Sequence, residues 1–458
     1  MSNFDWSLYP EADEMLSSIV SGLLVHNAVA RTLSETLARE TGTRFFDWVD
    51  HVAVPAEEMS PGVLTRLGFL ERRDSTRAPG TRAYFLPGST LFPVLLVDDG
   101  ATRLALKPEN LDHFLQMKHL YHVGQKKEAI EGQELGFYRR ALVNRQENHE
   151  LWAIERRGFD GFKLPDVSWN SDEHLTVLQE LMTRRRIYNS DTDSLSQLID
   201  MIEDLSGKLP LPLVTDAFFR TERRFWQNKT RGGQVQKSLQ DRLGLGWGNH
   251  DHHTYRSSRE NFHLLIELFE KMGFKLREKF FAGSKAGWGA QVLEHPICGI
   301  TIFADVDITD EERDADFAHE KMSSTSKLGT VGLWVALHGE SILQAGMHHL
   351  AARVDFAAAR TILKKNGVQT LRPFSDFEFL KQSFTEAERR KVASDRLQEC
   401  LAGGGISQKR HGVFRSQGAI GSHLEIIQRT RGFKGFNQDS VSVIIKTTDP
   451  RKSTERYA

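Results

Sequence analysis

The chain has 458 residues, of which 39% are hydrophobic and 26% charged. Its 60 Lys and Arg residues against 61 Asp and Glu residues give a net charge of −1. This balance argues against a nucleic-acid partner or an acidic membrane surface, because such partners select for an excess of Lys and Arg. The length predicts two or three structural units rather than one core.

Cysteine usage and hydropathy point to a reducing compartment. Only two cysteines occur, Cys298 and Cys400, which argues against a disulfide framework or a cysteine-based zinc site. The N-terminus lacks a basic segment followed by an apolar one, and no apolar run approaches the roughly 20 residues that a membrane helix needs. We therefore expect a cytoplasmic protein, and the sequence does not indicate its oligomeric state.

The same sequence pattern occurs three times along the chain. Each copy has a short strand beginning with His, then apolar residues at helical spacing, then a Gly and a second strand. The Gly suits the left-handed residue that ends many helices. The strands begin at His51, His252 and His349, and the helices end at Gly68, Gly273 and Gly367.

Further strand patterns follow the first two copies, at 83–86 and 92–97 and at 290–293 and 299–304. The repeat therefore predicts an α+β fold of βαβββ modules with large helical insertions. The third copy is predicted to have a helical insertion at 376–400 and strands at 412–417, 423–429 and 441–446. The predicted division is an N-terminal helix with a non-metal module (1–106), a mostly helical insertion (107–243), a metal-binding module (244–310), a second helical insertion (311–345), and a second metal-binding module with a C-terminal lid (346–458).

Strand phase selects candidate metal ligands. Alternate residues of a strand share one face, so His252 points to the same side as Arg256, and His349 to the same side as Arg353. The imidazoles of His252 and His349 could therefore supply the two nitrogen ligands of a mononuclear metal site. A single strand histidine is more often structural, so the evidence lies in the recurrence at one place of a repeat.

A carboxylate on a late strand completes the candidate set. Glu425 lies among apolar, β-branched residues, where a carboxylate is costly to bury unless it is paired or coordinated. His252, His349 and Glu425 would form a facial triad of two histidines and one carboxylate, which suits non-heme Fe(II). The alternative for Glu425 is an ion pair with Arg429 or a lysine. By the same phase rule, His253 and His348 are predicted to point away from the metal.

These stretches resemble known families. The modules resemble the vicinal oxygen chelate superfamily, which implies that they form a curved mixed sheet around a metal. Residues 251–256, 348–353 and 425–429 resemble the metal-ligand motifs of the 2-oxoadipate dioxygenase/decarboxylase family. Residues 425–437 are also similar to the C-terminal signature of 4-hydroxyphenylpyruvate dioxygenase. In 348–353, His stands for that family's first Asn and Ala-Ala for its Thr-Pro, so the wall beside the metal differs and the substrate stays open.

The resemblance implies an activity. It implies an Fe(II) dioxygenase in which a 2-oxo acid, or a related hydroxy acid, chelates the metal and is oxidatively decarboxylated by O2 without external 2-oxoglutarate. Arg256 is the expected clamp for the substrate carboxylate. Arg353 is a second candidate of this kind, and Gln428 is expected to orient the site. Phe433 and Phe436 are expected on the C-terminal lid.

Two other readings stay open at this point. One is a lyase, isomerase or epimerase of the same superfamily that uses Mn, Co, Ni or Zn as a Lewis acid. The other is a non-catalytic protein that binds a metal or a small molecule. The strand of His51 lacks an Arg four residues on and has Pro55 there, so we interpret the first copy as structural and His51 as a non-ligand.

Overall fold

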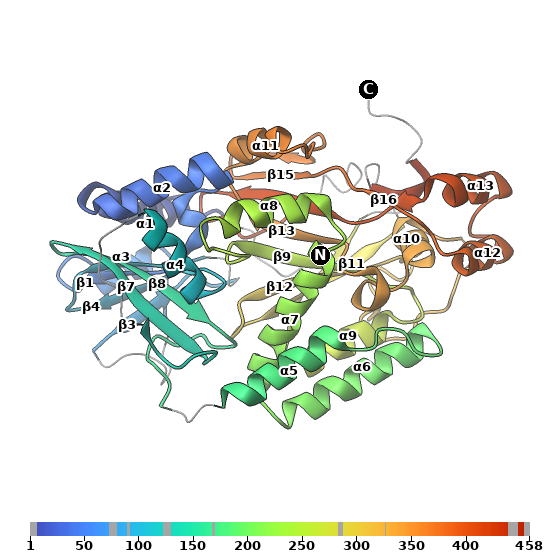
Figure 1. Ribbon diagram of the computed structural model, residues 1–458, viewed down its shortest axis with the longest axis horizontal. Helices are drawn as coiled ribbons and strands as arrows, with labels where there is room; N and C mark the ends of the chain where they lie inside the picture. The colour runs from blue at the N-terminus through green and yellow to red at the C-terminus, as the bar shows by residue number, and fades with distance from the viewer. Residues whose placement is uncertain are drawn as a thin grey trace.

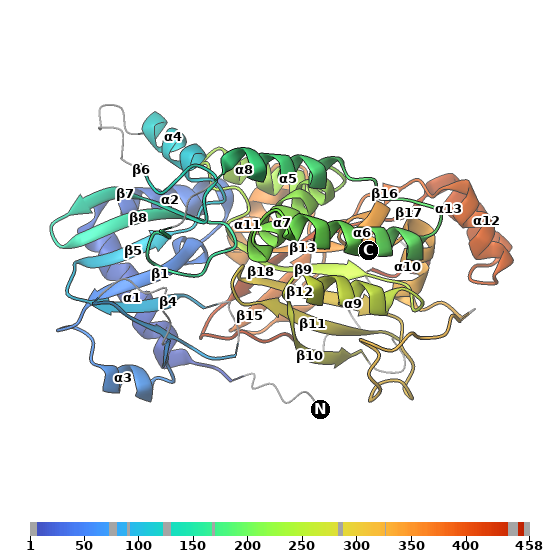
Figure 2. The ribbon, with the colours of Figure 1, turned by 90° about the horizontal axis from the view of Figure 1, so that it is seen from below.

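Two eight-stranded sheets lie next to each other in the computed structural model (Figures 1 and 2). The structure describes residues 7–72, 80–88, 92–121, 130–166, 170–282, 287–325, 327–437 and 448–452. The strand orders are β2-β3-β4-β1-β5-β8-β7-β6 and β10-β11-β12-β9-β13-β18-β15-β14. The two sheets have the same topology. Each contains two βαβββ modules, which meet at the two central strands.

The first sheet contains both modules of the N-terminal half. The first module is β1 (Val49–Pro55), α3 (Pro61–Arg66), β2 (Leu70–Arg72), β3 (Arg82–Phe85) and β4 (Val94–Asp98). The second is β5 (Thr102–Leu106), α4 (Leu111–Tyr121), β6 (Ile130–Glu131), β7 (Tyr138–Gln146) and β8 (His149–Arg156). Helices α1 (Pro10–His26) and α2 (Ala28–Thr41) and the 3-10 turn η1 (Phe45–Trp48) precede them.

The second sheet has the same composition in the C-terminal half. Its first module is β9 (His250–Arg256), α9 (Phe262–Lys271), β10 (Lys275–Phe281), β11 (Gly289–His295) and β12 (Ile300–Val306). Its second is β13 (His349–Arg353), α11 (Phe356–Lys365), β14 (Ser375–Asp376), β15 (Leu380–Phe384) and β18 (His423–Arg429). The two central strands of each sheet are antiparallel to each other: β1 with β5, and β9 with β13. Each central strand also pairs in parallel with its other neighbour: β1 with β4, β5 with β8, β9 with β12, and β13 with β18.

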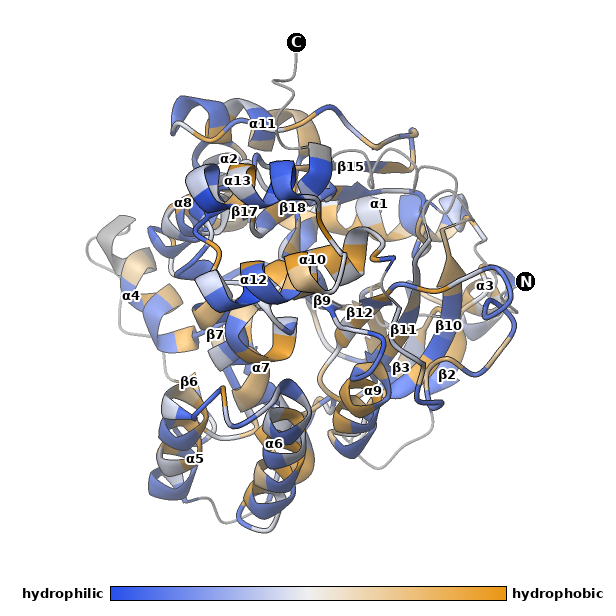
Figure 3. Cartoon of the chain, turned by 90° about the vertical axis from the view of Figure 1, so that its right-hand side faces the viewer, coloured by the Kyte–Doolittle hydropathy of each residue, from blue (hydrophilic) through white to orange (hydrophobic). Residues whose placement is uncertain are grey.

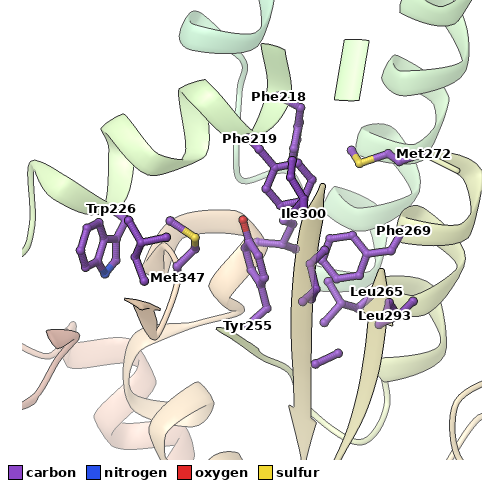
Figure 4. Packing of buried hydrophobic residues seen from close by; sticks show 14 of the residues in the cluster. Phe218, Phe219, Trp226, Tyr255, Leu265, Phe269, Met272, Leu293, Ile300 and Met347 are labelled. Atoms are coloured by element: carbon purple, nitrogen blue, oxygen red, sulfur yellow. The ribbon is translucent and has the colours of Figure 1, made fainter. Parts of the chain in front are cut away.

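Four helices connect the halves: α5 (Ser171–Thr183), α6 (Asp191–Ser206), α7 (Leu211–Gln227) and α8 (Arg231–Asp241). They form the main core with the second sheet, and α7 is buried along most of its length. Phe219 of α7 packs edge-on against Tyr255 of β9, with ring centroids 6.3 Å apart, and stacks near Phe269 of α9 (Figure 4). This layer fixes one face of β9 and leaves its other face for a site.

Most of the remaining elements lie beside the second sheet, on the side farther from the first sheet (Figure 1). They are α10 (Thr330–His338), a π-helical turn η2 (Ser341–Ala345), β16 (Arg389–Arg390), α12 (Ser394–Ala402), α13 (Gln408–Gln417), β17 (Ala419–Ile420) and the 3-10 turn η3 (Pro450–Lys452). Most of α10 is apolar (Figure 3), in keeping with its burial. No helix of the described residues combines the length and hydropathy needed to cross a membrane.

The structure confirms the α+β class and the predicted repeat, but it corrects several elements. Residues 107–243 are not mostly helical insertion, because β6, β7 and β8 complete the first sheet. Among the described residues of 311–345 only α10 and η2 are helical, and 376–400 contains the strand β15. Residues 412–417 lie in a helix, since Ser407 caps its start by accepting from the Arg410 amide and Gly418 ends it with a φ of 70°. The predicted strand 441–446 lies outside the described residues.

Candidate metal centre

Strand β9 divides its side chains between two environments. The His253 ring packs 5.3 Å from Phe219, on the helical side together with Tyr255. His252, Thr254 and Arg256 face the opposite side, where they line one cavity. The phase predicted for His252 and His253 is therefore confirmed, and the helical layer is the reason that only one of the two adjacent histidines reaches the cavity.

His252, His349 and Glu425 converge on that cavity from β9, β13 and β18. Glu425 Oε2 lies 3.2 Å from His252 Nε2 and 3.1 Å from His349 Nε2. One donor atom from each of these buried side chains lies within 4.8 Å of the others. The strands bring them together because β13 is the neighbour of both β9 and β18.

The donor spacing fits one ion. Ligands bound about 2.1 Å from a metal and at right angles to each other are about 3.0 Å apart, which is close to both contacts of Glu425. The set leaves further coordination positions open, as the facial arrangement of two histidines and a carboxylate does. The described residues thus provide a group that could hold a single metal ion.

Other side chains orient these ligands. His252 Nδ1 lies 2.9 Å from Asp251 Oδ1, and the Arg429 guanidinium donates to both oxygens of Asp251 at 2.9 and 3.0 Å. Gln382 Nε2 donates to Glu425 Oε1 at 2.8 Å, which leaves Oε2 for the histidines. Such bonds fix ring orientation and donor basicity in metal sites. Strand spacing did not predict Gln382, since β15 was expected to be helical.

Without a metal, the site holds one positive and one negative charge. Burial opposes ionisation of both His252 and Glu425, but their mutual attraction outweighs it: the pKa of His252 rises to about 9, and that of Glu425 falls well below its usual range. Burial lowers the pKa of His349, so this ring stays neutral. One imidazolium and one carboxylate therefore face each other, and binding of a metal would release the His252 proton.

A second histidine cluster adjoins the first. His348, His349 and His423 also bring nitrogens within 4.8 Å of one another, with His348 Nδ1 3.1 Å from His349 Nδ1. His348 lines the cavity, contrary to the phase prediction, because it precedes β13 and does not follow the alternation of that strand. Burial holds the pKa values of His348 and His423 well below normal. This set lacks a carboxylate to offset the charge of a cation.

The cavity beside the triad is small, about 80 Å³, and its wall is mostly aromatic. Several polar atoms of its lining residues have no hydrogen-bond partner among the described residues: Arg256 Nε and Nη1, Trp288 Nε1, His348 Nε2 and Gln382 Oε1. Buried polar groups are rarely left unpaired. The unpaired set therefore points to a polar ligand.

Arg256 and Asp305 are the charged side chains opposite the triad. Arg256 Nε is 3.8 Å from Asp305 Oδ2, too long for a hydrogen bond, and Nη2 donates to Thr448 at 3.2 Å. Burial lowers the pKa of Arg256 to about 10 and raises that of Asp305 to about 7. The sequence analysis missed Asp305, although it lies at the end of a predicted strand.

Two predicted functional residues lie elsewhere. Arg353 ends β13 and lines a different cavity, because β13 is antiparallel to β9 and runs away from Arg256 toward the start of β9. Gln428 has the opposite strand phase to Glu425, and its Oε1 accepts from the Phe356 amide at the start of α11 at 2.8 Å. The structure therefore corrects the placement of both residues at the metal site.

The C-terminal phenylalanines have separate surroundings. Phe436 lines the cavity, with its ring centroid 5.3 Å from that of His252. Phe433 packs instead with Ala351 and Ile427 on the sheet. Phe436 is thus the member of the expected lid that touches the candidate site.

The N-terminal half repeats the His–Asp–Arg set of the site but has other residues at the positions of His349 and Glu425. His51 Nδ1 contacts Asp50 at 2.8 Å, and Arg156 donates to both oxygens of Asp50, as in the set of His252, Asp251 and Arg429. Yet Arg103 occupies the register position of His349, and Trp152 that of Glu425. A guanidinium repels a cation, so this position agrees with the interpretation of His51 as a non-ligand.

No family model matches the chain, and no curated protein matches it. Solved structures similar to it include a hydrolase from Shewanella frigidimarina, at 14% identity over 48% of this chain and 96% of that one, with a TM-score of 0.34. A mutant of 4-hydroxymandelate synthase from Streptomyces coelicolor is 13% identical over 89% and 99%, with a TM-score of 0.29. An uncharacterized protein from Shigella flexneri is 13% identical over 63% and 89%, with a TM-score of 0.25.

Those similarities are too distant to transfer an activity. The fold class rests on the topology itself, in which paired βαβββ modules form one sheet and a ligand set lies on the adjacent strands β9, β13 and β18. This topology is the one that the resemblance to the vicinal oxygen chelate superfamily implies.

Proposed function

We propose that this protein is a mononuclear metal enzyme whose ion is held by His252, His349 and Glu425. The observation that carries the proposal is the convergence of three buried donor atoms, with Glu425 Oε2 within 3.2 Å of both imidazoles. In the metal-free protein the protonated His252 compensates the buried Glu425 carboxylate, and a metal cation could take the place of that proton. The further support from Asp251, Arg429 and Gln382 is more than a structural ion pair requires.

The proposed reaction is the Fe(II)-dependent oxidative decarboxylation of a 2-oxo acid that chelates the metal, with O2 as the oxidant. Two neutral nitrogens and one carboxylate are the donor set typical of non-heme Fe(II) oxygenases, and the bound ion would supply the redox chemistry that makes O2 reactive. The resemblance of residues 251–256 and 425–429 to dioxygenase motifs supports the same choice.

The protein's own side chains would then bind and orient the substrate. The unpaired Nε and Nη1 of Arg256 lie on different edges of the guanidinium, and either can donate a charge-assisted hydrogen bond to the substrate carboxylate. A protonated Asp305 beside them can donate a hydrogen bond instead of repelling that carboxylate. Phe303 and Phe436, whose ring centroids lie 4.4 Å apart, would exclude water from the metal-facing end.

The test is anaerobic purification with metal analysis, followed by Fe(II) reconstitution and measurement of O2 uptake with a panel of 2-oxo acids. We expect about one metal per chain and its loss in His252→Ala and Glu425→Ala. His423→Ala is the matched control from the second histidine cluster and should retain the metal. Arg256→Met should raise KM by about tenfold or more, because a charged hydrogen-bond pair contributes roughly 1.5–3 kcal/mol.

The outcomes separate the candidate functions. Full metal occupancy in both ligand variants contradicts the proposed site. A metal that is lost in those variants, but with no O2 uptake by the Fe(II) form, favours a metal-dependent lyase or isomerase and contradicts the dioxygenase. A protein that binds no metal after reconstitution contradicts both.

A further inference from the structure

A large cavity lies at the boundary between the two halves and shares no lining residue with the metal site. Its volume is about 670 Å³. Its walls come from both sheets, with β1, β4 and Phe159 on one side and Glu294, residues 296–299 and Arg353 on the other. Apolar side chains form much of this wall, among them Phe85, Phe92 and Phe162. The cavity has the size of a small-molecule site.

Two cations in this cavity have no hydrogen-bond or ion-pair partner for their side chains among the described residues. They are Lys107 and Arg353, and Arg353 Nε is buried from solvent. Burial lowers the pKa of both groups, that of Lys107 to about 8, and outweighs the opposing attraction of Asp50 for Lys107 and of Asp47 and Asp251 for Arg353. Two partly buried like charges in one cavity are costly unless an anion joins them.

The other charged groups of the cavity are already paired. Arg156 donates to Asp50 at 2.9 Å, and Arg72 pairs with Asp160. On the opposite wall Glu294 accepts from Arg277 at 2.8 Å. The unneutralised charge of the cavity is therefore positive and belongs to Lys107 and Arg353.

Lys107 and Arg353 are equivalent residues of the two halves. Leu106 pairs with Ala153, three residues before Arg156 ends β8, while Ala352 pairs with Ile426, three residues before Arg429 ends β18. Lys107 directly follows Leu106, and Arg353 directly follows Ala352. The internal repeat thus brings two equivalent positive charges to the boundary, where a single anionic group can meet both.

We propose that this cavity is a second ligand site, which binds a small organic anion. The carboxylate or phosphate of the ligand would lie between Lys107 and Arg353, and its apolar body against Phe85, Phe92 and Phe162. The ligand class follows from the combination of two unpaired donors with an aromatic wall. The inference goes beyond the proposed metal site and does not depend on it.

Isothermal titration calorimetry with phenyl phosphate, benzoate and inorganic phosphate, in a low-chloride buffer, tests the proposal on the full chain. We expect phenyl phosphate or benzoate to bind with a Kd below about 1 mM and more tightly than inorganic phosphate. Lys107→Met and Arg353→Met should each weaken binding by about tenfold or more. Arg140→Met is the matched control, since Arg140 lines the neighbouring cavity and pairs with Glu131.

Further measurements separate this site from the metal centre and from a structural role. Binding should be unchanged after metal removal and in Glu425→Ala, and Lys107→Arg should retain it. The neutral variants should melt at the same temperature as the natural protein or higher, because each removes an unpaired charge. Absence of binding by all three probes, equal binding by Lys107→Met and Arg140→Met, or unfolding of either neutral variant would overturn the proposal.

Discussion

At the scale of single residues, the candidate centre depends on side chains that do not touch the metal position. Asp251 holds His252 Nδ1 at 2.9 Å and is itself held by Arg429. This arrangement leaves Nε2 as the free donor atom of His252 and sets the orientation of the ring. The same set exists in the first half as His51, Asp50 and Arg156, where no ligand partners follow.

That duplication provides a controlled experiment. Asp251→Asn should weaken metal affinity by about 10–100-fold, the usual effect of losing a carboxylate behind a histidine ligand. Asp50→Asn makes the same change in the first half and should leave metal affinity unaltered. Both variants leave a buried arginine without its carboxylate, so both should lower Tm. Competition against a chromophoric chelator measures the affinities, and equal affinities in the two variants would contradict the assigned role of Asp251.

Asp305 makes the stability of the metal-free protein depend on pH. Burial raises its folded-state pKa to about 7, above the unfolded value near 3.9, so the folded state binds more protons between those values. Stability from this group is therefore greatest below about pH 4, is lost as pH rises, and reaches its minimum above about pH 7.

Asp305→Asn should remove this dependence. Relative to the natural protein, the free energy of unfolding of the variant should rise between about pH 4 and 7, by about 4 kcal/mol in total, and then level off. Urea denaturation at a series of pH values, after metal removal, measures the difference. A difference that does not change with pH would show that Asp305 is ionised throughout this range in the folded protein.

At the scale of elements, β18 serves two purposes because its faces alternate. Glu425 faces the metal cavity, while Gln428 faces α11 and accepts from the Phe356 amide. Asp355 supplies the N-cap by accepting from Ala358 at 2.9 Å, so Gln428 satisfies another of the free amides of the first turn.

This geometry gives Gln428 a structural role. Gln428→Leu should lower the free energy of unfolding by about 1 kcal/mol, the usual loss for one helix-terminus hydrogen bond, and leave metal affinity unchanged. Chemical denaturation and chelator competition measure the two quantities. Reduced metal affinity at unchanged stability would instead restore the orienting role predicted from the sequence.

The elements also show why part of the architecture could be predicted from the sequence. Hydrophobic alternation and recurring histidines identified the modules of β1, β9 and β13, and strand phase selected His252 over His253. The module that begins at β5 was missed because Arg103 stands where the others have histidine. Strand β15 was taken for helix because its buried polar residues, such as Gln382, are explained only by the partner Glu425. Contacts far apart in sequence are not visible in local periodicity.

At the scale of the whole molecule, the two halves approach closely where α2 ends. Gly42 has a φ of 68°, and its carbonyl accepts from the Asp355 amide at 2.9 Å. A β-carbon on Gly42 would lie 2.7 Å from the Cα of Ala359 in α11. Arg44 adds a hydrogen bond to the Arg429 carbonyl at 3.1 Å. The junction therefore requires glycine for both its conformation and its lack of a side chain.

Gly42→Ala should consequently lower the free energy of unfolding by about 2–4 kcal/mol, since a left-handed alanine costs about 1 kcal/mol and the overlap with α11 about as much or more. Gly22→Ala is the matched control. Gly22 lies within α1, where an added β-carbon meets nothing within 4 Å, so alanine should stabilise the helix by about 0.5–1 kcal/mol. Chemical denaturation of both variants measures the contrast. Arg429 belongs to this junction through Arg44 and also binds Asp251, so Gly42→Ala should weaken metal affinity as well. Equal stability of the two variants would mean that the halves are not packed this closely.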